Sequence, residues 1–219
     1  MRAVGTRERL VHAAFTLFEE KGYDAVTVEE IAQRAQVGRT TLFRLFGSKE
    51  ELIFPDHDAL LARAEERLSL ASEEDSKRIA AVVEAAKGVF MYYMKEGELA
   101  RARFRLTSSA PALRDREIAS VGRYIRLFTR YLLPSAPRDS SATLRAELIA
   151  TAVVTSHNHV LRRWLRGEST RPEQEFSEAM ETTVALFSRS SETRTAVAVF
   201  ETTETMAVVV PRLKRALTK

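Results

Sequence analysis

The 219-residue chain contains no cysteine, and it has few of the residues that mark catalytic or metal sites. Without cysteine it can form neither a disulfide nor a thiolate metal site, which favours a cytoplasmic protein. Its 4 histidines are too few and too scattered to define a site. It also lacks a glycine-rich phosphate loop and the Walker, Rossmann, HExxH and GxSxG patterns. We therefore expect no enzymatic activity, no metal and no cofactor.

Long hydrophobic runs are missing too. No apolar stretch reaches the length that spans a bilayer, and the N-terminal MRAVGTRERL has no hydrophobic signal core. With 45% hydrophobic and 29% charged residues, the composition is that of a globular protein. The net charge of +4 fits an anionic partner, but acids and bases are mixed along the chain, so charge alone does not indicate DNA. We expect no membrane partner.

The segment TVEEIAQRAQVGRTTLFRLFGSKEE (27–51) carries the clearest structural signals. Thr27 and Glu30 have the spacing of a capping box, which predicts the start of a helix. Ser48 and Glu51 repeat that spacing and predict that a longer helix starts at Lys49. Only one short helix fits between them. This order is the outline of a helix-turn-helix, whose second helix reads a DNA groove.

Apolar residues at helical spacing continue to about residue 190, so the predicted fold class is all-α. Pro55 lies one turn into the helix that is expected from Lys49, where it predicts a kink at Phe54 or a new start at Asp56. Pro111 is well placed as the first residue of a helix. The expected helices cover about residues 7–21, 28–35, 39–45, 49–70, 76–96, 97–106, 111–132, 142–166 and 172–190.

The C-terminal residues differ in kind. In TAVAVF (195–200), β-branched residues alternate with alanine, which predicts a short strand. A single strand needs a partner. It could pair with its own copy across a dimer axis or fold back on MAVVV (206–210), and the last residues would be a short basic helix or a tail. The expected domains are a DNA-binding domain (1–48), a helical dimerisation and ligand domain (49–192) and a C-terminal extension (193–219).

The N-terminal part resembles the TetR family of bacterial transcriptional regulators. The resemblance covers Thr6 to Leu52 and rests on TRERLVHAAFTLFEEKGYDAVTVEEIA and TLFRLFGSKEEL. It implies a homodimer whose N-terminal units insert a recognition helix into the major groove of double-stranded operator DNA. It also implies a helical C-terminal domain that dimerises, usually through its last two helices, and often encloses a small ligand.

The resemblance implies DNA contacts along the helix-turn-helix. Arginine on a recognition helix can bind guanine O6 and N7 through two hydrogen bonds. The alternative for an arginine here is a solvated position on an exposed helix. The implied DNA-binding residues are Thr27, Arg39, Thr40, Thr41, Phe43, Arg44 and Lys49, with phosphate contacts expected from Thr27 and Lys49.

Four positions depart from the family pattern. Phe43 replaces a tyrosine that usually binds phosphate, and Leu45 replaces a common histidine. Gln36 stands at a turn position usually held by glycine, where a left-handed backbone would cost roughly 1 kcal/mol. Gly38 replaces the usual serine cap. Fewer phosphate anchors predict weaker nonspecific affinity and a larger share of the binding for the arginines.

Aromatic and polar residues in the C-terminal helices are candidates for a ligand pocket. Aromatics at helical spacing also form ordinary core, and the polar residues could be satisfied in a helix-packing or dimer interface. His157 and His159 diverge by about 200° on a helix, which disfavours a shared metal. An occupant would be small and hydrophobic, with few hydrogen bonds. The candidates are Phe90, Tyr93, Met94, Phe104, Tyr124, Phe128, His157, Asn158 and Trp164.

Two functions follow from these features. The first is a ligand-responsive transcriptional regulator, a repressor that binds a pseudo-palindromic operator as a homodimer and is released by a small hydrophobic ligand. The second is a ligand-independent architectural or protein-recruiting factor on the same fold. A sealed, fully packed C-terminal core would favour the second, and a single high-affinity operator beside its own gene would favour the first.

Overall fold

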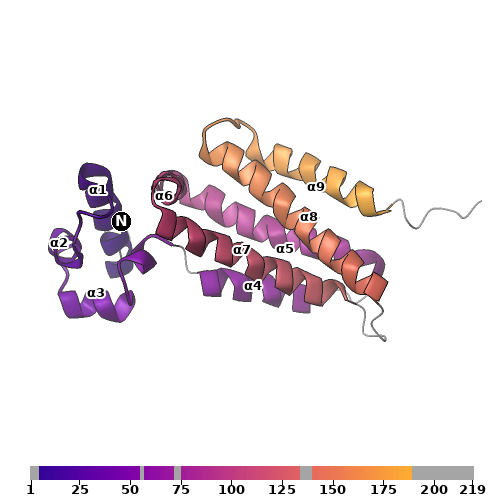
Figure 1. The fold of residues 1–219 in the computed structure, drawn as a ribbon, viewed down its shortest axis with the longest axis horizontal. Helices are drawn as coiled ribbons and strands as arrows, with labels where there is room; N and C mark the ends of the chain where they lie inside the picture. The colour runs from indigo at the N-terminus through magenta and orange to yellow at the C-terminus, as the bar shows by residue number, and fades with distance from the viewer. Residues whose placement is uncertain (1–4, 55–56, 72–74, 134–139, 189–219) are drawn as a thin grey trace, which may run out of the picture. The chain divides into compact units, whose positions relative to one another are not determined.

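The computed structural model describes residues 5–54, 57–71, 75–133 and 140–188, and this part of the chain is helical throughout (Figure 1). Its lack of strands confirms the all-α fold class for these residues. The expected strand and the bend at Pro55 fall outside the described residues. The elements are α1 (Thr6–Lys21), α2 (Val28–Arg34), α3 (Arg39–Leu45), the 3-10 helix η1 (Glu50–Leu52), α4 (His57–Ser69), α5 (Asp75–Glu96), α6 (Glu98–Ser109), α7 (Pro111–Leu132), α8 (Ser140–Leu165) and α9 (Pro172–Ser188).

The first three helices and η1 form a small core around Leu10, Ile31 and Leu42, each of them fully buried. A unit of about fifty residues is marginally stable alone. Here α1 packs against α6, whose Leu99 and Leu106 are partly buried against the N-terminal core. The N-terminal helices therefore depend on α6 for part of their burial.

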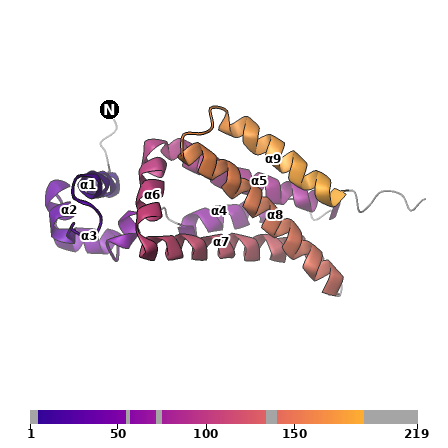
Figure 2. The ribbon, with the colours of Figure 1, turned by 45° about the horizontal axis from the view of Figure 1, so that its top comes forward.

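The second core lies among α4, α5, α7, α8 and α9. Figures 1 and 2 show α5 and α7 extending in the same general direction, with α8 passing obliquely across them in Figure 2 and α6 crossing the ends of α5 and α7. Phe90 on α5 and Phe176 on α9 are buried against each other, with ring centroids 4.7 Å apart. Within the described part of the chain, every helix is too short or too polar to cross a bilayer.

One local prediction was wrong. The expected helix from Lys49 is only the 3-10 turn η1, because the Glu51 carboxylate accepts a hydrogen bond from the Gly47 N–H (2.8 Å) and does not cap a helix at Ser48. The α-helix starts at His57, close to the expected restart after proline. On α7, Ile118 is 60% exposed, whereas Glu117, Val121 and Tyr124 line a cavity among the C-terminal helices.

Candidate functional site

The start of α2 is fixed by the capping box. The Glu30 N–H donates to Thr27 Oγ1 (3.2 Å), and the Thr27 N–H donates to a Glu30 carboxylate oxygen (2.8 Å), which confirms the prediction. The hydrogen bond from Lys21 and those from Thr27 lower the pKa of Glu30 to about 2. Because the carboxylate stays ionised, the cap persists throughout the neutral pH range.

The turn between α2 and α3 has a left-handed residue at Gln36, with φ 53°. The Val37 N–H donates to the Ala32 carbonyl (2.9 Å), which closes the turn. Gly38 then begins α3 without a side-chain cap. The chain therefore keeps the turn geometry expected at this position while carrying roughly 1 kcal/mol of backbone strain at Gln36.

One face of α3 is buried and the opposite face is open. Leu42 is fully buried, whereas Arg39, Thr40, Phe43 and Arg44 are exposed. Residues 39 and 43, like 40 and 44, are separated by four positions, so these four side chains share one face of the helix. Thr41 is only partly exposed. The residues expected to read DNA thus lie together, apart from Thr41.

Arg39 has partners within the chain. Its Nη1 lies 2.9 Å from Glu29 Oε1, and its guanidinium lies 5.5 Å from the centre of the Phe43 ring. Both charged side chains are more than half exposed, so this ion pair is weak and easily exchanged. Arg39 can leave Glu29 for a base or a phosphate at little cost.

Lys49 lies against the turn before α2. Its ammonium donates to the Tyr23 and Val26 carbonyls, each at 3.0 Å, and lies 4.2 Å from the centre of the Tyr23 ring. The Tyr23 hydroxyl donates in turn to the Glu50 carboxylate (2.7 Å). Since an ammonium has three donors, Lys49 can hold this turn and still offer one donor to a phosphate.

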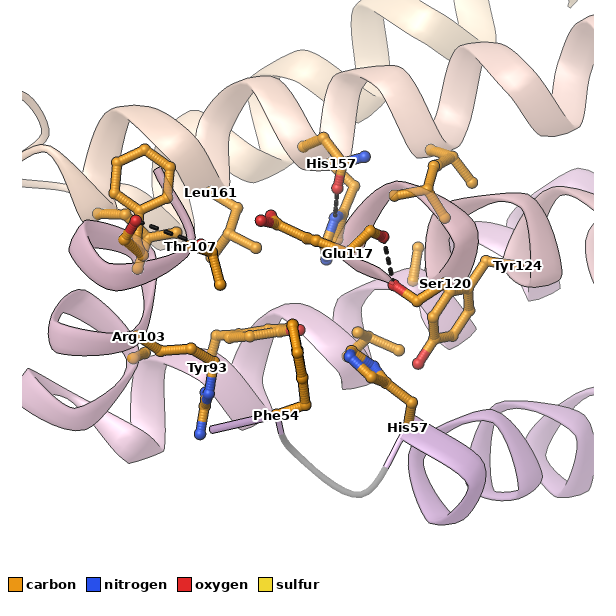
Figure 3. Close-up of a pocket in the computed structure, with 18 of the residues that line it drawn as sticks. Phe54, His57, Tyr93, Arg103, Thr107, Glu117, Ser120, Tyr124, His157 and Leu161 are labelled. Atoms are coloured by element: carbon orange, nitrogen blue, oxygen red, sulfur yellow. Dashed lines mark hydrogen bonds between the residues drawn. The ribbon is translucent and has the colours of Figure 1, made fainter. Parts of the chain in front are cut away.

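A cavity lies within the C-terminal helices, and the space open to the centre of a water molecule is about 80 Å³ (Figure 3). Of the nine ligand candidates, six line it and three do not. Phe90 packs on Phe176, Trp164 stacks under the Arg101 guanidinium, and Met94 packs against the core. The lining residues are Phe54, His57, Ala86, Val89, Tyr93, Ala100, Arg103, Phe104, Thr107, Glu117, Ser120, Val121, Tyr124, Phe128, Val154, His157, Asn158, Leu161 and Leu165.

His157 presents a hydrogen-bond acceptor to this cavity. Its Nδ1–H donates to Asn158 Oδ1 (3.0 Å), which leaves Nε2 buried with a lone pair and no hydrogen-bond partner among the described residues. Burial lowers the pKa of His157 to about 4, so the ring is neutral at pH 7. The buried Tyr124 hydroxyl also lacks a hydrogen-bond partner there, and burial raises its pKa. Both groups can bind a ligand.

Sequence reasoning missed Glu117. It lines the cavity from α7, and Figure 3 shows its side chain extending into the space between His157 and Thr107. Its carboxylate has no hydrogen-bond donor and no salt-bridge partner among the described residues. The signal was present, because Glu117 precedes Val121 and Tyr124 by four and seven positions, the spacing of a single helix face.

Arg103 on α6 connects the cavity wall to the N-terminal core. Only 7% exposed, it donates from Nε to the Ile53 carbonyl (2.5 Å) and from its two Nη atoms to the Glu96 carboxylate (2.5 and 3.3 Å). Ile53 directly follows η1 and is buried in the N-terminal core. Arg103 therefore joins the cavity wall to the end of the N-terminal helical unit.

Comparison with known proteins gives a consistent result. Residues 10–55 match the family model described as bacterial regulatory proteins, tetR family. The HTH-type transcriptional regulator TcmR of Streptomyces glaucescens is 32% identical over 125 residues, which are 55% of this chain and 53% of TcmR. The chain covers between 29% and 62% of the length of the five curated relatives it matches.

Solved structures share the fold. A TetR-family transcriptional regulator from Syntrophomonas wolfei superposes with a TM-score of 0.60 at 14% identity, covering 83% of this chain and 94% of that one. Thermus thermophilus FadR, a TetR-family repressor solved in complex with lauroyl-CoA, superposes with a TM-score of 0.51 at 22% identity, covering 89% of this chain and all of that one. At these identities the likeness concerns the fold.

Proposed function

We propose that this chain, which residues 10–55 place in the TetR family of bacterial regulatory proteins, is a ligand-responsive repressor that binds a pseudo-palindromic operator as a homodimer. The observation that carries the proposal is the open face of α3. Arg39, Thr40, Phe43 and Arg44 share it, opposite the buried Leu42. A short helix held in this way after a tight turn can enter the major groove and present its side chains to base edges.

The cavity supports ligand response over the architectural alternative. A repressor of this fold, T. thermophilus FadR, has been solved with a small molecule bound. Here the cavity wall includes Arg103, whose guanidinium also holds the Ile53 carbonyl. A ligand that binds more tightly when Arg103 takes one position than when it takes another would favour one of two dimer conformations. Only one of these conformations would fit the operator.

Exposed leucines support a dimer through α8 and α9. Leu144 and Leu148 lie one turn apart on α8 and are 56% and 52% exposed, and Leu186 on α9 is 69% exposed. Arg145 donates to the Phe187 carbonyl (2.8 Å), which joins this end of α8 to the end of α9. A surface of this kind is suited to pairing with its own copy across a two-fold axis.

Replacing Leu148 with aspartate should therefore convert the dimer into a monomer, because pairing would bury a carboxylate among leucines. Light scattering after size-exclusion chromatography measures the mass directly. Leu70→Asp is the matched control, since Leu70 is 81% exposed beyond the end of α4, and it should remain dimeric. A dimeric Leu148→Asp variant would exclude this interface.

DNase footprinting of the full chain on DNA upstream of its own gene tests the function. We expect one protected site with two half-sites whose centres are about one helical turn, roughly 10 base pairs, apart. The site should remain protected when a large excess of unrelated DNA is present. Equal binding to all fragments, with no protected site, would favour the architectural alternative.

A further inference from the structure

The charges around the cavity are unbalanced. Glu96 neutralises Arg103 through two contacts, so this cation is not available to an acidic ligand. His157 is neutral at pH 7. Glu117, by contrast, faces the cavity with no cation paired to it among the described residues. A carboxylate that lines a largely apolar space without a counter-charge favours an occupant that supplies one, and a bound cation would do so.

The rest of the wall suits a cation as well. The unpaired ring nitrogen of His157 can only accept a hydrogen bond, as can the Glu117 carboxylate. Aromatic rings of Tyr93, Phe104 and Tyr124 line the same space, and ring faces attract ammonium groups. Figure 3 shows Tyr93 and Glu117 on opposite sides of the space. A ligand that brings N–H donors and a positive charge would match these groups.

We propose that the cavity binds a protonated amine with an apolar body, whose ammonium group pairs with Glu117. This inference rests on the proposed function, because it names the class of ligand that the regulator senses. The amine would donate to the Glu117 carboxylate and to His157 Nε2, and its apolar part would pack on the aromatic wall. The Glu117 carboxylate would repel an acidic ligand, and the Arg103 guanidinium already pairs with Glu96.

Calorimetric titration of the full-length protein at pH 7.5 with three probes of similar size tests the proposal. The probes are 3-phenylpropylammonium, the neutral 3-phenyl-1-propanol and the anionic 3-phenylpropanoate. The ammonium probe should bind at least tenfold more tightly than the other two. Glu117→Gln keeps the side-chain shape, and it should remove this preference while leaving the affinity for the alcohol within about twofold. Glu117→Lys should reverse the preference toward 3-phenylpropanoate.

Tightest binding of the alcohol or the carboxylate to the natural chain, no binding of the ammonium probe, or an unchanged preference in Glu117→Gln would each overturn the proposal. Thermal melting of the variants without probe shows whether they are folded. Footprinting with the same probes separates this inference from the proposed function. Release of the operator by 3-phenylpropanoate alone would overturn the amine and leave the ligand-responsive repressor intact. Glu117-dependent amine binding by a chain that protects no operator would support the amine proposal and overturn the proposed repressor function.

Discussion

Replacing Arg39 and Arg44 together with alanine should weaken operator binding by about thirtyfold or more. Each arginine that binds a guanine edge contributes roughly 1 to 3 kcal/mol of discrimination, so losing both removes about 2 kcal/mol at least. The effect should be large here because Phe43 lacks the hydroxyl that would bind a phosphate. Fluorescence anisotropy with the footprinted operator at fixed salt measures the change, since affinity depends steeply on ionic strength.

Glu29→Ala is the matched control for this experiment. Glu29 pairs with Arg39 in the free protein at 2.9 Å, so its removal deletes the same ion pair while keeping the arginine. If Arg39 contacts the DNA, the Glu29→Ala variant should bind the operator as tightly as the natural chain or more tightly, because the substitution removes a negative charge near the phosphates. Intact binding by the double arginine variant would show that α3 is not the recognition helix.

Signals within a few residues of one another predicted the structure of the first three helices well. The Thr27 and Glu30 box and the left-handed Gln36 depend on contacts at most five residues apart, and both are present in the structure. The Ser48 and Glu51 pair has the same spacing and failed, because the Glu51 carboxylate reaches the Gly47 N–H and Pro55 cannot continue a helix. Spacing alone does not decide between these outcomes.

The cavity was only partly predictable because its polar groups meet across the fold. Tyr93, Tyr124 and His157 come from α5, α7 and α8, and helical spacing could nominate them only as candidates. Phe90 has the same apolar pattern and packs on Phe176, 86 positions away, outside the cavity lining. The choice between lining and core depends on which helices meet. That information is not in any local window of the sequence.

Arg103 shows this limit most clearly, since Ile53 lies fifty positions before it. Its side chain is buried with that of Glu96, the two being 8% and 15% exposed. Without Arg103, the Tyr92 hydroxyl would be the one donor left to the Glu96 carboxylate among the residues that the structure describes, and the Ile53 carbonyl would lose its bond to Arg103. Removing one member of a buried ion pair costs far more than the pair contributes as a whole, because an uncompensated charge remains.

Arg103→Met should therefore lower the free energy of unfolding by about 3 to 5 kcal/mol, as measured by urea denaturation at pH 7. Arg105→Ala is the control on the same helix, because its pair with Glu19 is about 60% exposed on both sides and should contribute no more than about 1 kcal/mol. Adding Glu96→Gln to Arg103→Met removes the uncompensated charge and should recover most of the loss. The double variant should therefore fold and bind the operator. Because it still lacks the bond to Ile53, it should no longer release the operator when a ligand occupies the cavity. Equal denaturation midpoints for Arg103→Met and Arg105→Ala would show that the buried pair does not hold the two cores together.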